Sequence, residues 1–150
     1  METLKIRPAT EDDEARVFEL LRQFPAEDIP AARPFDWESG REAFRQIVAD
    51  EAKGTILLAV QGDLLLGICS LSYPMAVHCA GRYTCIEEFI VSPNSRGKGV
   101  GRRLIEAAIV RATEQGCYEM QVNRPSELGY PVYLRHGFID AGKHLLLRLP

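Results

Sequence analysis

The stretch that decides the fold spans residues 86–104 and reads Ile86-Glu87-Glu88-Phe89-Ile90-Val91-Ser92-Pro93-Asn94-Ser95-Arg96-Gly97-Lys98-Gly99-Val100-Gly101-Arg102-Arg103-Leu104. A β-branched and aromatic run typical of a strand ends at Pro93, and a basic, glycine-rich turn then leads into an amphipathic helix. This order places free backbone N–H groups at the positive end of a helix dipole, where they can bind an anion. Because glycines carry no side chain, an extended phosphate group can lie against the main chain. The stretch therefore predicts a site for a phosphorylated ligand.

The glycine spacing excludes two common phosphate motifs. A P-loop needs Gly-x-x-x-x-Gly-Lys-Ser/Thr, and no such spacing occurs around Gly97. A dinucleotide fingerprint needs Gly-x-Gly-x-x-Gly, but here the third glycine, Gly101, comes one residue early. Glu119 lies at the distance of a ribose-binding acid, but it falls inside the next expected strand instead of at a strand end. The remaining pattern is Arg-x-x-Gly-x-Gly, which begins at Arg96.

This pattern resembles the pyrophosphate-binding turn of the GNAT superfamily, the acyl-CoA-dependent N-acetyltransferases. Residues 86–91 resemble the family's central strand, which carries the catalytic carboxylate and lines the pantetheine arm. Residues 132–138 resemble its Phe-Tyr-x-x-x-Gly-Phe segment, with Val132 in place of the first phenylalanine. Where the family has an asparagine seven residues before the tyrosine, this chain has Ser126. The resemblance is sharp from about residue 83 to residue 138 and looser over the N-terminal half.

The resemblance implies that acetyl-CoA is the co-substrate, held by the strand end, the turn and the later segment. The implied cofactor-binding residues are Phe89, Ile90, Val91, Arg96, Gly97, Lys98, Gly99, Val100, Gly101, Arg102 and Ser126. By the same analogy, residues 89–91 offer main-chain contacts to pantetheine, and the N–H group of Val91 stabilises the oxyanion.

Transfer of an acetyl group from a thioester to an amine needs a base, because a free alkyl amine has a pKa of about 10.4. Adjacent strand residues point to opposite faces, so only one of Glu87 and Glu88 faces the cofactor. Alternation places Glu87 with Phe89, and the family places its carboxylate at this position, so Glu87 is the candidate base. Tyr133 is the candidate proton donor to the leaving sulfur. Two alternatives stay open: Glu87 as a solvated surface charge, and Tyr133 as a packing residue.

Composition limits the partners of the chain. A length of 150 residues predicts a single N-acetyltransferase domain over residues 1–150, and a net charge of −3 argues against nucleic acid. Long apolar runs are absent, so we expect no membrane partner and a cytoplasmic location. The four cysteines lack C-x-x-C spacing, and His78 and His144 are isolated in the sequence. No metal site is therefore expected.

The pattern of apolar residues and turn signals predicts alternating helices and strands. Strands are expected over residues 4–7, 54–60, 64–73, 83–91 and 118–123, with a final pair over 138–149. Helices are expected after Thr10 and Asp36, between the glycine turn and Gly116, and over about 128–136. The expected fold is α+β: a three-layer α/β/α sandwich with a mixed, mainly antiparallel, GNAT-like sheet of about six to seven strands and about four helices. In that fold the two strands after the phosphate turn splay apart, and the cofactor lies in the gap.

These observations predict an N-acetyltransferase that moves an acetyl group from acetyl-CoA to a primary amine by direct transfer in a ternary complex. The expected acceptor is a small molecule or a peptide that carries an amine. The resemblance implies that the loops over residues 25–37 and 74–82 shape its pocket, and the acids Glu27, Asp28 and Asp36 would suit a cationic amine. The alternative is a non-catalytic acyl-CoA-binding or sensing module, which would keep the turn without needing Glu87 or Tyr133. The acceptor, the acyl-chain preference and the choice between monomer and homodimer stay open.

Overall fold

A five-stranded sheet forms the centre of the computed structural model, which describes residues 2–23, 36–142, 144–145 and 147–149. The strand order is β1 (Lys5–Pro8), β2 (Gly54–Gln61), β3 (Leu64–Ser72), β6 (Thr84–Val91) and β7 (Met120–Val122). Neighbouring strands are antiparallel except for β6 and β7, which are parallel. A separate hairpin pairs β4 (Met75–Ala76) with β5 (Gly81–Arg82).

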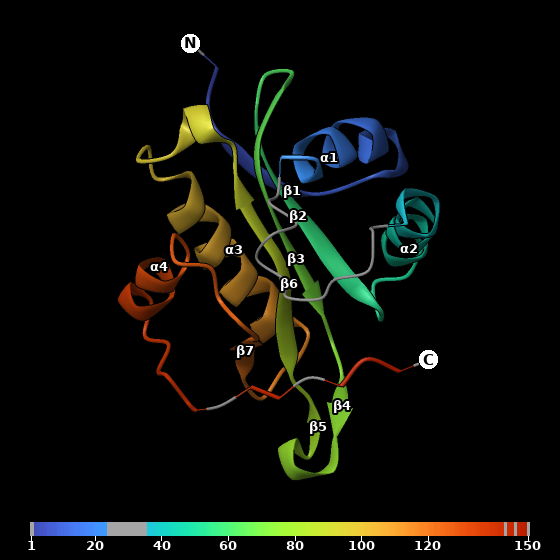
Figure 1. Cartoon of the computed structure of the whole chain (residues 1–150), viewed down its shortest axis with the longest axis vertical. Coiled ribbons are helices and arrows are strands. Elements are labelled where there is room, and N and C mark those ends of the chain that lie inside the picture. The colour runs from blue at the N-terminus through green and yellow to red at the C-terminus, as the bar shows by residue number, and fades with distance from the viewer. Residues whose placement is uncertain (1, 24–35, 143, 146, 150) are drawn as a thin grey trace.

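Helices cover both faces of the sheet (Figure 1). One face carries α1 (Glu14–Leu21) and α2 (Trp37–Ala49), and the other carries α3 (Val100–Glu114) and α4 (Tyr130–Arg135). Short 3-10 helices span Glu11–Asp13, Val77–Cys79 and Pro93–Ser95. The expected cap at the start of α2 is present, because the Asp36 carboxylate accepts a hydrogen bond of 3.0 Å from the backbone N–H of Ser39. The three-layer α/β/α prediction is thus confirmed.

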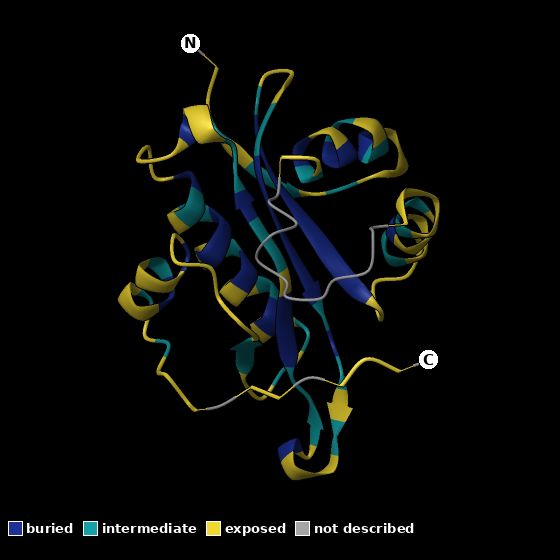
Figure 2. Ribbon diagram, viewed as in Figure 1, coloured by how far each residue is buried: buried dark blue, intermediate teal, exposed yellow. Residues whose placement is uncertain are grey.

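The two faces of the sheet have separate apolar cores, as the dark strands of Figure 2 indicate. Strands β2, β3 and β6 contribute to both cores, which is why β2 is buried along nearly its whole length. The core under α3 contains Leu57, Cys69, Ile86, Leu104, Ile105 and Ala108, and the core under α1 and α2 contains Val17, Phe18, Phe44, Leu58, Ile68 and Ile90.

The strands β6 and β7 separate after a short paired segment. Residues 84–86 of β6 pair with residues 120–122 of β7, and β6 then continues to Val91 beyond the last residue of β7. One of these strands precedes the glycine turn and the other follows it, so the expectation that both follow the turn was wrong. The divergence leaves an opening beside the C-terminal end of β6.

The expected strand pair over 138–149 is also a correction. The described residues of this segment, 138–142, 144–145 and 147–149, contain no strand, so the main sheet has five strands and the whole described chain has seven. The segment is rich in apolar residues, but such a run forms a strand only where a partner edge pairs with it. Leu145 and Leu147 are instead 89% and 82% exposed. Among the described helices, none has the length and apolar character needed to cross a membrane.

Candidate active site

The glycine turn joins the end of β6 to the start of α3 with a left-handed backbone. Gly97 has φ = +74° and Gly99, the N-cap of α3, has φ = +81°. A Cβ atom at either position would meet no atom within 4 Å, so the backbone conformation, not lack of space, requires glycine. The N–H groups of the first turn of α3 have no acceptor within the helix and are available to an anion.

Gly101 serves a different purpose, which is to let α3 begin close to β6. A Cβ atom here would lie 3.2 Å from Cζ of Phe89 and 3.6 Å from Cγ2 of Val91. Glycine therefore keeps the first turn of the helix beside the end of the strand. The anion-binding N–H groups and the open edge of β6 consequently form one continuous surface.

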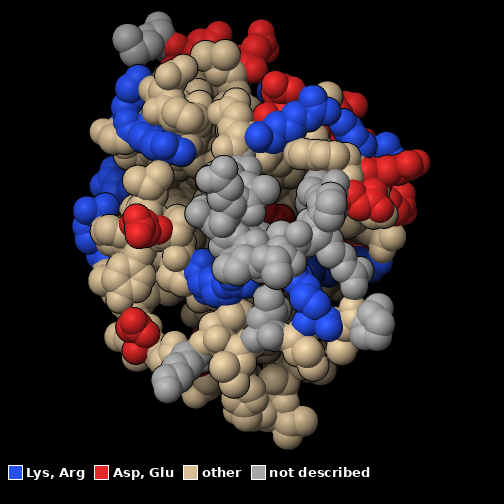
Figure 3. Space-filling model, in the orientation of Figure 1, with Lys and Arg blue, Asp and Glu red and all other residues tan. Residues whose placement is uncertain are grey.

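Two of the basic residues at the turn, Arg96 and Arg103, form hydrogen bonds to backbone carbonyl groups. The Arg103 side chain donates a hydrogen bond of 2.8 Å to the carbonyl of Leu4, and Arg96 donates one of 3.2 Å to the carbonyl of Val91. Lys98 and Arg102 are exposed. Figure 3 shows basic side chains beside the start of α3, where they can attract an anionic ligand.

A groove of about 590 Å³ lies between the diverging strands and α4. It is lined by Ile86, Glu87, Phe89, Tyr133 and residues 122–128. Both candidate catalytic residues therefore meet in one cavity with two of the predicted cofactor-binding residues, Phe89 and Ser126. The second predicted strand contact, Ile90, is not brought there, because its side chain is buried in the core under α1 and α2.

The backbone of β6 turns two N–H groups toward the gap. The N–H of Ser92 donates a hydrogen bond of 2.8 Å to the carbonyl of Leu66 in β3. Successive N–H groups along a strand point to opposite edges, so those of Phe89 and Val91 point away from β3 and toward the side that β7 leaves open. This geometry agrees with main-chain contacts at residues 89 and 91.

A β-bulge at Glu87 sets the direction of its side chain. Ser70 pairs with Glu88 and Leu71 pairs with Ile86, so Glu87 is an extra residue without a partner on β3. The bulge places Ile86 and Phe89 in the same core, which strict alternation would forbid. Glu87 thus lines the groove as predicted, but because of the bulge and not because of simple alternation.

The two glutamates have different surroundings. The carboxylate of Glu87 is exposed and accepts a hydrogen bond of 2.7 Å from the hydroxyl of Ser72. Glu88 is half-buried next to Ser70, and burial raises the pKa of its carboxyl group. Sequence reasoning missed Ser72, because only the pairing of β3 with β6, in which Ser72 lies opposite Cys85, brings its hydroxyl to the carboxylate of Glu87.

Tyr133 lines the groove and is held there by aromatic packing. Its ring lies 5.5 Å from that of Phe89 and 5.3 Å from that of Phe138. The Tyr133 hydroxyl makes no hydrogen bond to a described residue, and no buried side-chain nitrogen or oxygen of the described residues lacks a hydrogen-bond partner. The hydroxyl is therefore accessible to solvent. Burial of the ring raises its pKa above the ordinary value, so the phenol stays protonated.

Ser126 starts the segment that carries Tyr133. Its hydroxyl accepts a hydrogen bond of 3.0 Å from the N–H of Gly129, just before α4. A Cβ atom at Gly129 would lie 3.2 Å from Cε2 of Tyr133, so glycine leaves room for the ring. The serine that replaces the expected asparagine thus has a local role in placing Tyr133.

The two loops expected to shape an acceptor pocket differ in what can be described. Glu27 and Asp28 lie outside the described residues, and Asp36 caps α2. The loop over 74–82 contains the β4–β5 hairpin, which projects beyond the sheet (Figure 1).

Comparison with known proteins identifies the architecture. Residues 15–138 match the sequence profile of the acetyltransferase (GNAT) family. The chain belongs to this acetyltransferase family. Like its members, it is an acyl-CoA-dependent N-acetyltransferase and uses acetyl-CoA as co-substrate, which confirms the prediction from the glycine turn.

Individual relatives support this assignment. Glucosamine 6-phosphate N-acetyltransferase 1 of Oryza sativa subsp. japonica is 28% identical over 144 residues, which cover 93% of this chain and 83% of the relative. Aminoalkylphosphonate N-acetyltransferase of Salmonella typhimurium is 25% identical over 140 residues, covering 92% and 86%. The crystal structure of a predicted acetyltransferase with acetyl-CoA from Clostridium acetobutylicum has a TM-score of 0.81 at 19% identity, covering 97% and 96%.

The groove and turn of this GNAT protein have the chemistry that acetyl-CoA requires. A pyrophosphate needs N–H donors and positive charge, which the start of α3 and its basic residues supply. A pantetheine arm carries amides, which the free edge of β6 can bind. The described residues therefore fit the co-substrate.

Proposed function

We propose that this acetyltransferase transfers the acetyl group directly to a primary amine while both substrates are bound. The observation that carries the proposal is the shared groove, which places Glu87 and Tyr133 on one cavity beside the open edge of β6. A base and a proton donor at one cavity suit a reaction that moves one proton from the amine and gives another to sulfur.

Each step has a residue in this scheme. The Glu87 carboxylate, oriented by Ser72, takes a proton from the ammonium group directly or through water, and the free amine attacks the thioester carbonyl. The N–H of Val91 stabilises the negative charge on the carbonyl oxygen. The carbon–sulfur bond then breaks, and Tyr133 gives its proton to the leaving thiolate. The attacking nitrogen loses its second proton, which returns to Tyr133 through solvent, and Glu87 releases the first proton to solvent, so that both residues are restored. No acyl-enzyme forms, so holding the two substrates together supplies much of the rate.

Co-substrate binding is assigned to the turn and the strand end. Gly97, Gly99 and the first turn of α3 bind the pyrophosphate through main-chain N–H groups, with Lys98 and Arg102 adding charge. Main-chain groups of residues 89–91 bind the pantetheine arm, apart from the N–H of Val91, which is kept for the oxyanion. We further propose that residues 1–150 act as one domain, because the two cores share a single sheet, and that this domain works in the cytoplasm.

The acceptor is proposed to be a small amine. Two relatives are named for glucosamine 6-phosphate and for aminoalkylphosphonate, which are both amines with a phosphorus-containing acid group. Arg124, at the end of β7, lines the groove and could attract such a group. Phosphorylated and phosphonate amines are therefore the first acceptors to test.

Two measurements test the proposal. Calorimetric titration with acetyl-CoA, using ATP and NAD as controls, should give selective binding of acetyl-CoA. Thiol release with a panel of amines should then give initial-velocity lines that intersect, as a ternary complex requires, and not the parallel lines of a covalent intermediate. Acetyl-CoA binding without thiol release for any amine would favour a non-catalytic acyl-CoA-binding module. Lack of acetyl-CoA binding would refute the assigned cofactor site.

A further inference from the structure

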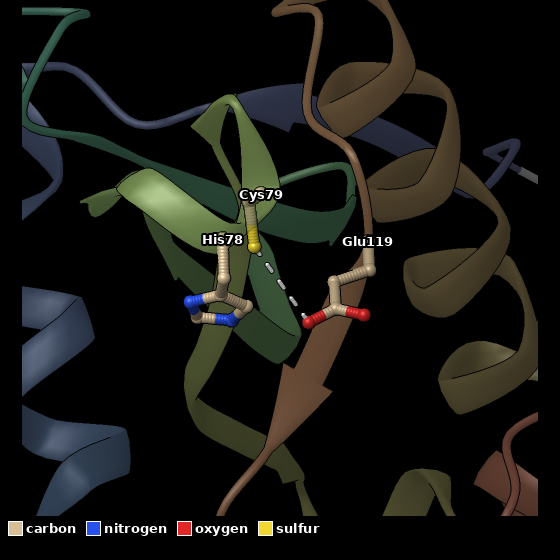
Figure 4. A group of neighbouring side chains, drawn as sticks. All are labelled: His78, Cys79 and Glu119. Carbon is tan, nitrogen blue, oxygen red and sulfur yellow. Dashed lines mark hydrogen bonds between the residues drawn. The ribbon is translucent and has the colours of Figure 1, made fainter.

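Three potential metal ligands meet outside the groove, where the turn of the β4–β5 hairpin approaches the start of β7. They are His78, Cys79 and Glu119, and their ligand atoms all lie within 4.8 Å of one another. Figure 4 shows the imidazole, the thiol and the carboxylate converging between the hairpin and the start of β7. The Cys79 sulfur lies 3.9 Å from Oε1 of Glu119. The described fold thus joins residues that lie about forty positions apart in the chain.

The backbone fixes this arrangement from both sides. Thr84 of β6 donates a backbone hydrogen bond of 2.9 Å to the carbonyl of Glu119. The N–H of Tyr118 donates one of 2.8 Å to the carbonyl of Arg82 in β5. The hairpin and the segment before β7 are therefore tied together on both sides of the three side chains.

We propose that His78, Cys79 and Glu119 bind Zn²⁺, with water completing the coordination. Imidazole, thiolate and carboxylate are the three ligand types that zinc takes in proteins, and three protein ligands plus water is a common open arrangement. Hard cations such as Mg²⁺ and Ca²⁺ prefer oxygen ligands, so a site with nitrogen and sulfur disfavours them. On binding, the sulfur–zinc bond replaces the sulfur–hydrogen bond of Cys79, and the proton leaves to solvent. The cysteinate and the glutamate then balance the two charges of the ion.

Only small side-chain movements are needed to form the site. In a tetrahedral zinc site with bonds of about 2.0–2.3 Å, ligand atoms lie about 3.5 Å apart. The present ligand-to-ligand distances, all within 4.8 Å, are therefore too wide by at most about 1.3 Å. The side chains of His78 and Glu119 are exposed and can rotate, whereas Cys79 is buried and already fixed. Exposure also gives the ion a direct path from solvent.

A neighbouring residue supports the carboxylate. The side-chain amide of Gln121 donates a hydrogen bond of 2.8 Å to Oε1 of Glu119. Such a donor behind a carboxylate ligand orients it toward the metal and stabilises the bound geometry. A bound ion would join the β4–β5 hairpin to β7 by coordinate bonds. A bound ion would therefore restrict the motion of the loop over residues 74–82.

This proposal departs from the expectation of no metal site. His78 was expected to be isolated, because the sequence shows only the adjacent His78-Cys79 pair and no C-x-x-C motif. Glu119 became a partner only through the parallel pairing of β6 with β7. Neither acetyl-CoA nor an amine enters the argument, so the proposal stands apart from the transferase mechanism.

The test is titration of the reduced, chelator-treated protein with Zn²⁺ and with Co²⁺. Zn²⁺ should bind at a stoichiometry of one ion per chain. Co²⁺ should give the intense sulfur-to-cobalt absorption in the near ultraviolet that marks a thiolate ligand, and Zn²⁺ should displace it. The Cys79→Ser variant should lose this absorption. His78→Ala and Glu119→Gln should each weaken zinc binding by at least about tenfold, since even removal of a supporting outer contact costs that much.

Matched variants control for loss of a thiol or a carboxylate elsewhere. Cys117→Ser removes another partly accessible thiol, and Glu114→Gln removes an exposed glutamate on α3. Both should keep the wild-type affinity and the cobalt spectrum. Failure of Zn²⁺ to bind would overturn the proposal, as would a cobalt spectrum that lacks the sulfur band. Equal binding by the wild type, His78→Ala and Glu119→Gln would overturn it too.

Discussion

Replacement of Tyr133 by phenylalanine separates the chemical role of the hydroxyl from the packing role of the ring. The ring would keep its contacts with Phe89 and Phe138, which lie 5.5 and 5.3 Å away between ring centroids. Since the hydroxyl makes no hydrogen bond to the described residues, its removal should change the free energy of unfolding by less than about 0.5 kcal/mol. Any large loss of activity is then chemical in origin.

The expected loss is in turnover. A positioned proton donor contributes roughly a hundredfold to ten-thousandfold, so kcat should fall by at least about a hundredfold, or about 2.7 kcal/mol in activation free energy. The Kd for acetyl-CoA should hardly change, because the pyrophosphate and pantetheine contacts come from other residues. Burial raises the pKa of Tyr133 above its ordinary value of about 10, so the wild-type donor stays protonated at every pH up to that value.

The assay is thiol release at saturating acetyl-CoA, combined with calorimetric binding and thermal unfolding of both proteins. Tyr130→Phe is the matched control: Tyr130 lies one helical turn earlier, is exposed, and donates a hydrogen bond of 3.3 Å to Asp140. This control should keep the wild-type kcat. A Tyr133→Phe protein that is folded, binds acetyl-CoA and turns over at the wild-type rate would remove Tyr133 from the mechanism.

Three further changes test other parts of the structure. Glu87→Gln should slow the reaction most at neutral pH and recover partly as the pH approaches about 10.4, where the amine deprotonates unaided; a pH–rate profile identical to the wild type would exclude Glu87 as base. Asp13→Asn should lower the free energy of unfolding by about 2 kcal/mol at pH 7, because the buried carboxylate accepts hydrogen bonds from Arg7 and Arg16, which are themselves partly exposed. The hydrogen bond from Arg7 is the largest of the effects that hold the pKa of Asp13 well below its usual range. The stabilisation is therefore present above about pH 4 and is lost as the pH falls further. Urea unfolding should show a smaller difference in free energy of unfolding between the two proteins at pH 3 than at pH 7. Gly99→Ala should cost about 1–2 kcal/mol of conformational strain at φ = +81°, seen as weaker acetyl-CoA binding or a lower melting temperature, and a variant with neither change would contradict the need for glycine in this turn.

The sequence was sufficient for features that depend on local chemistry. The glycine-rich turn, the Asp36 cap and the apolar stripe of α3 all depend on residues within one or two helical turns, and each prediction is confirmed in the described structure. The layered α+β fold followed from the order of such elements.

Features that depend on pairing between distant segments were not accessible. The bulge at Glu87 exists because Ser70 and Leu71 of β3 pair around it, and no residue within β6 signals it. The meeting of Cys79 with Glu119 likewise depends on which strands become neighbours. The leucine-rich segment after Gly142 shows the same limit from the other side: its composition suits a strand, yet its described residues pair with no strand edge.

Among the described residues, no strand pairs with the β7-facing edge of β6 beyond Ile86, and this affects the stability of the protein when no acetyl-CoA is bound. An unpaired strand edge is a template on which other chains can add, and proteins generally cover such edges. Here the co-substrate itself would serve as a temporary sixth strand, shielding the amides of Phe89 and Val91 from exchange with solvent. At a concentration of about a hundred times its Kd, acetyl-CoA would add about 2.7 kcal/mol to the stability of the fold. The concentration of acetyl-CoA would then determine the resistance of the chain to unfolding as well as the rate of the reaction.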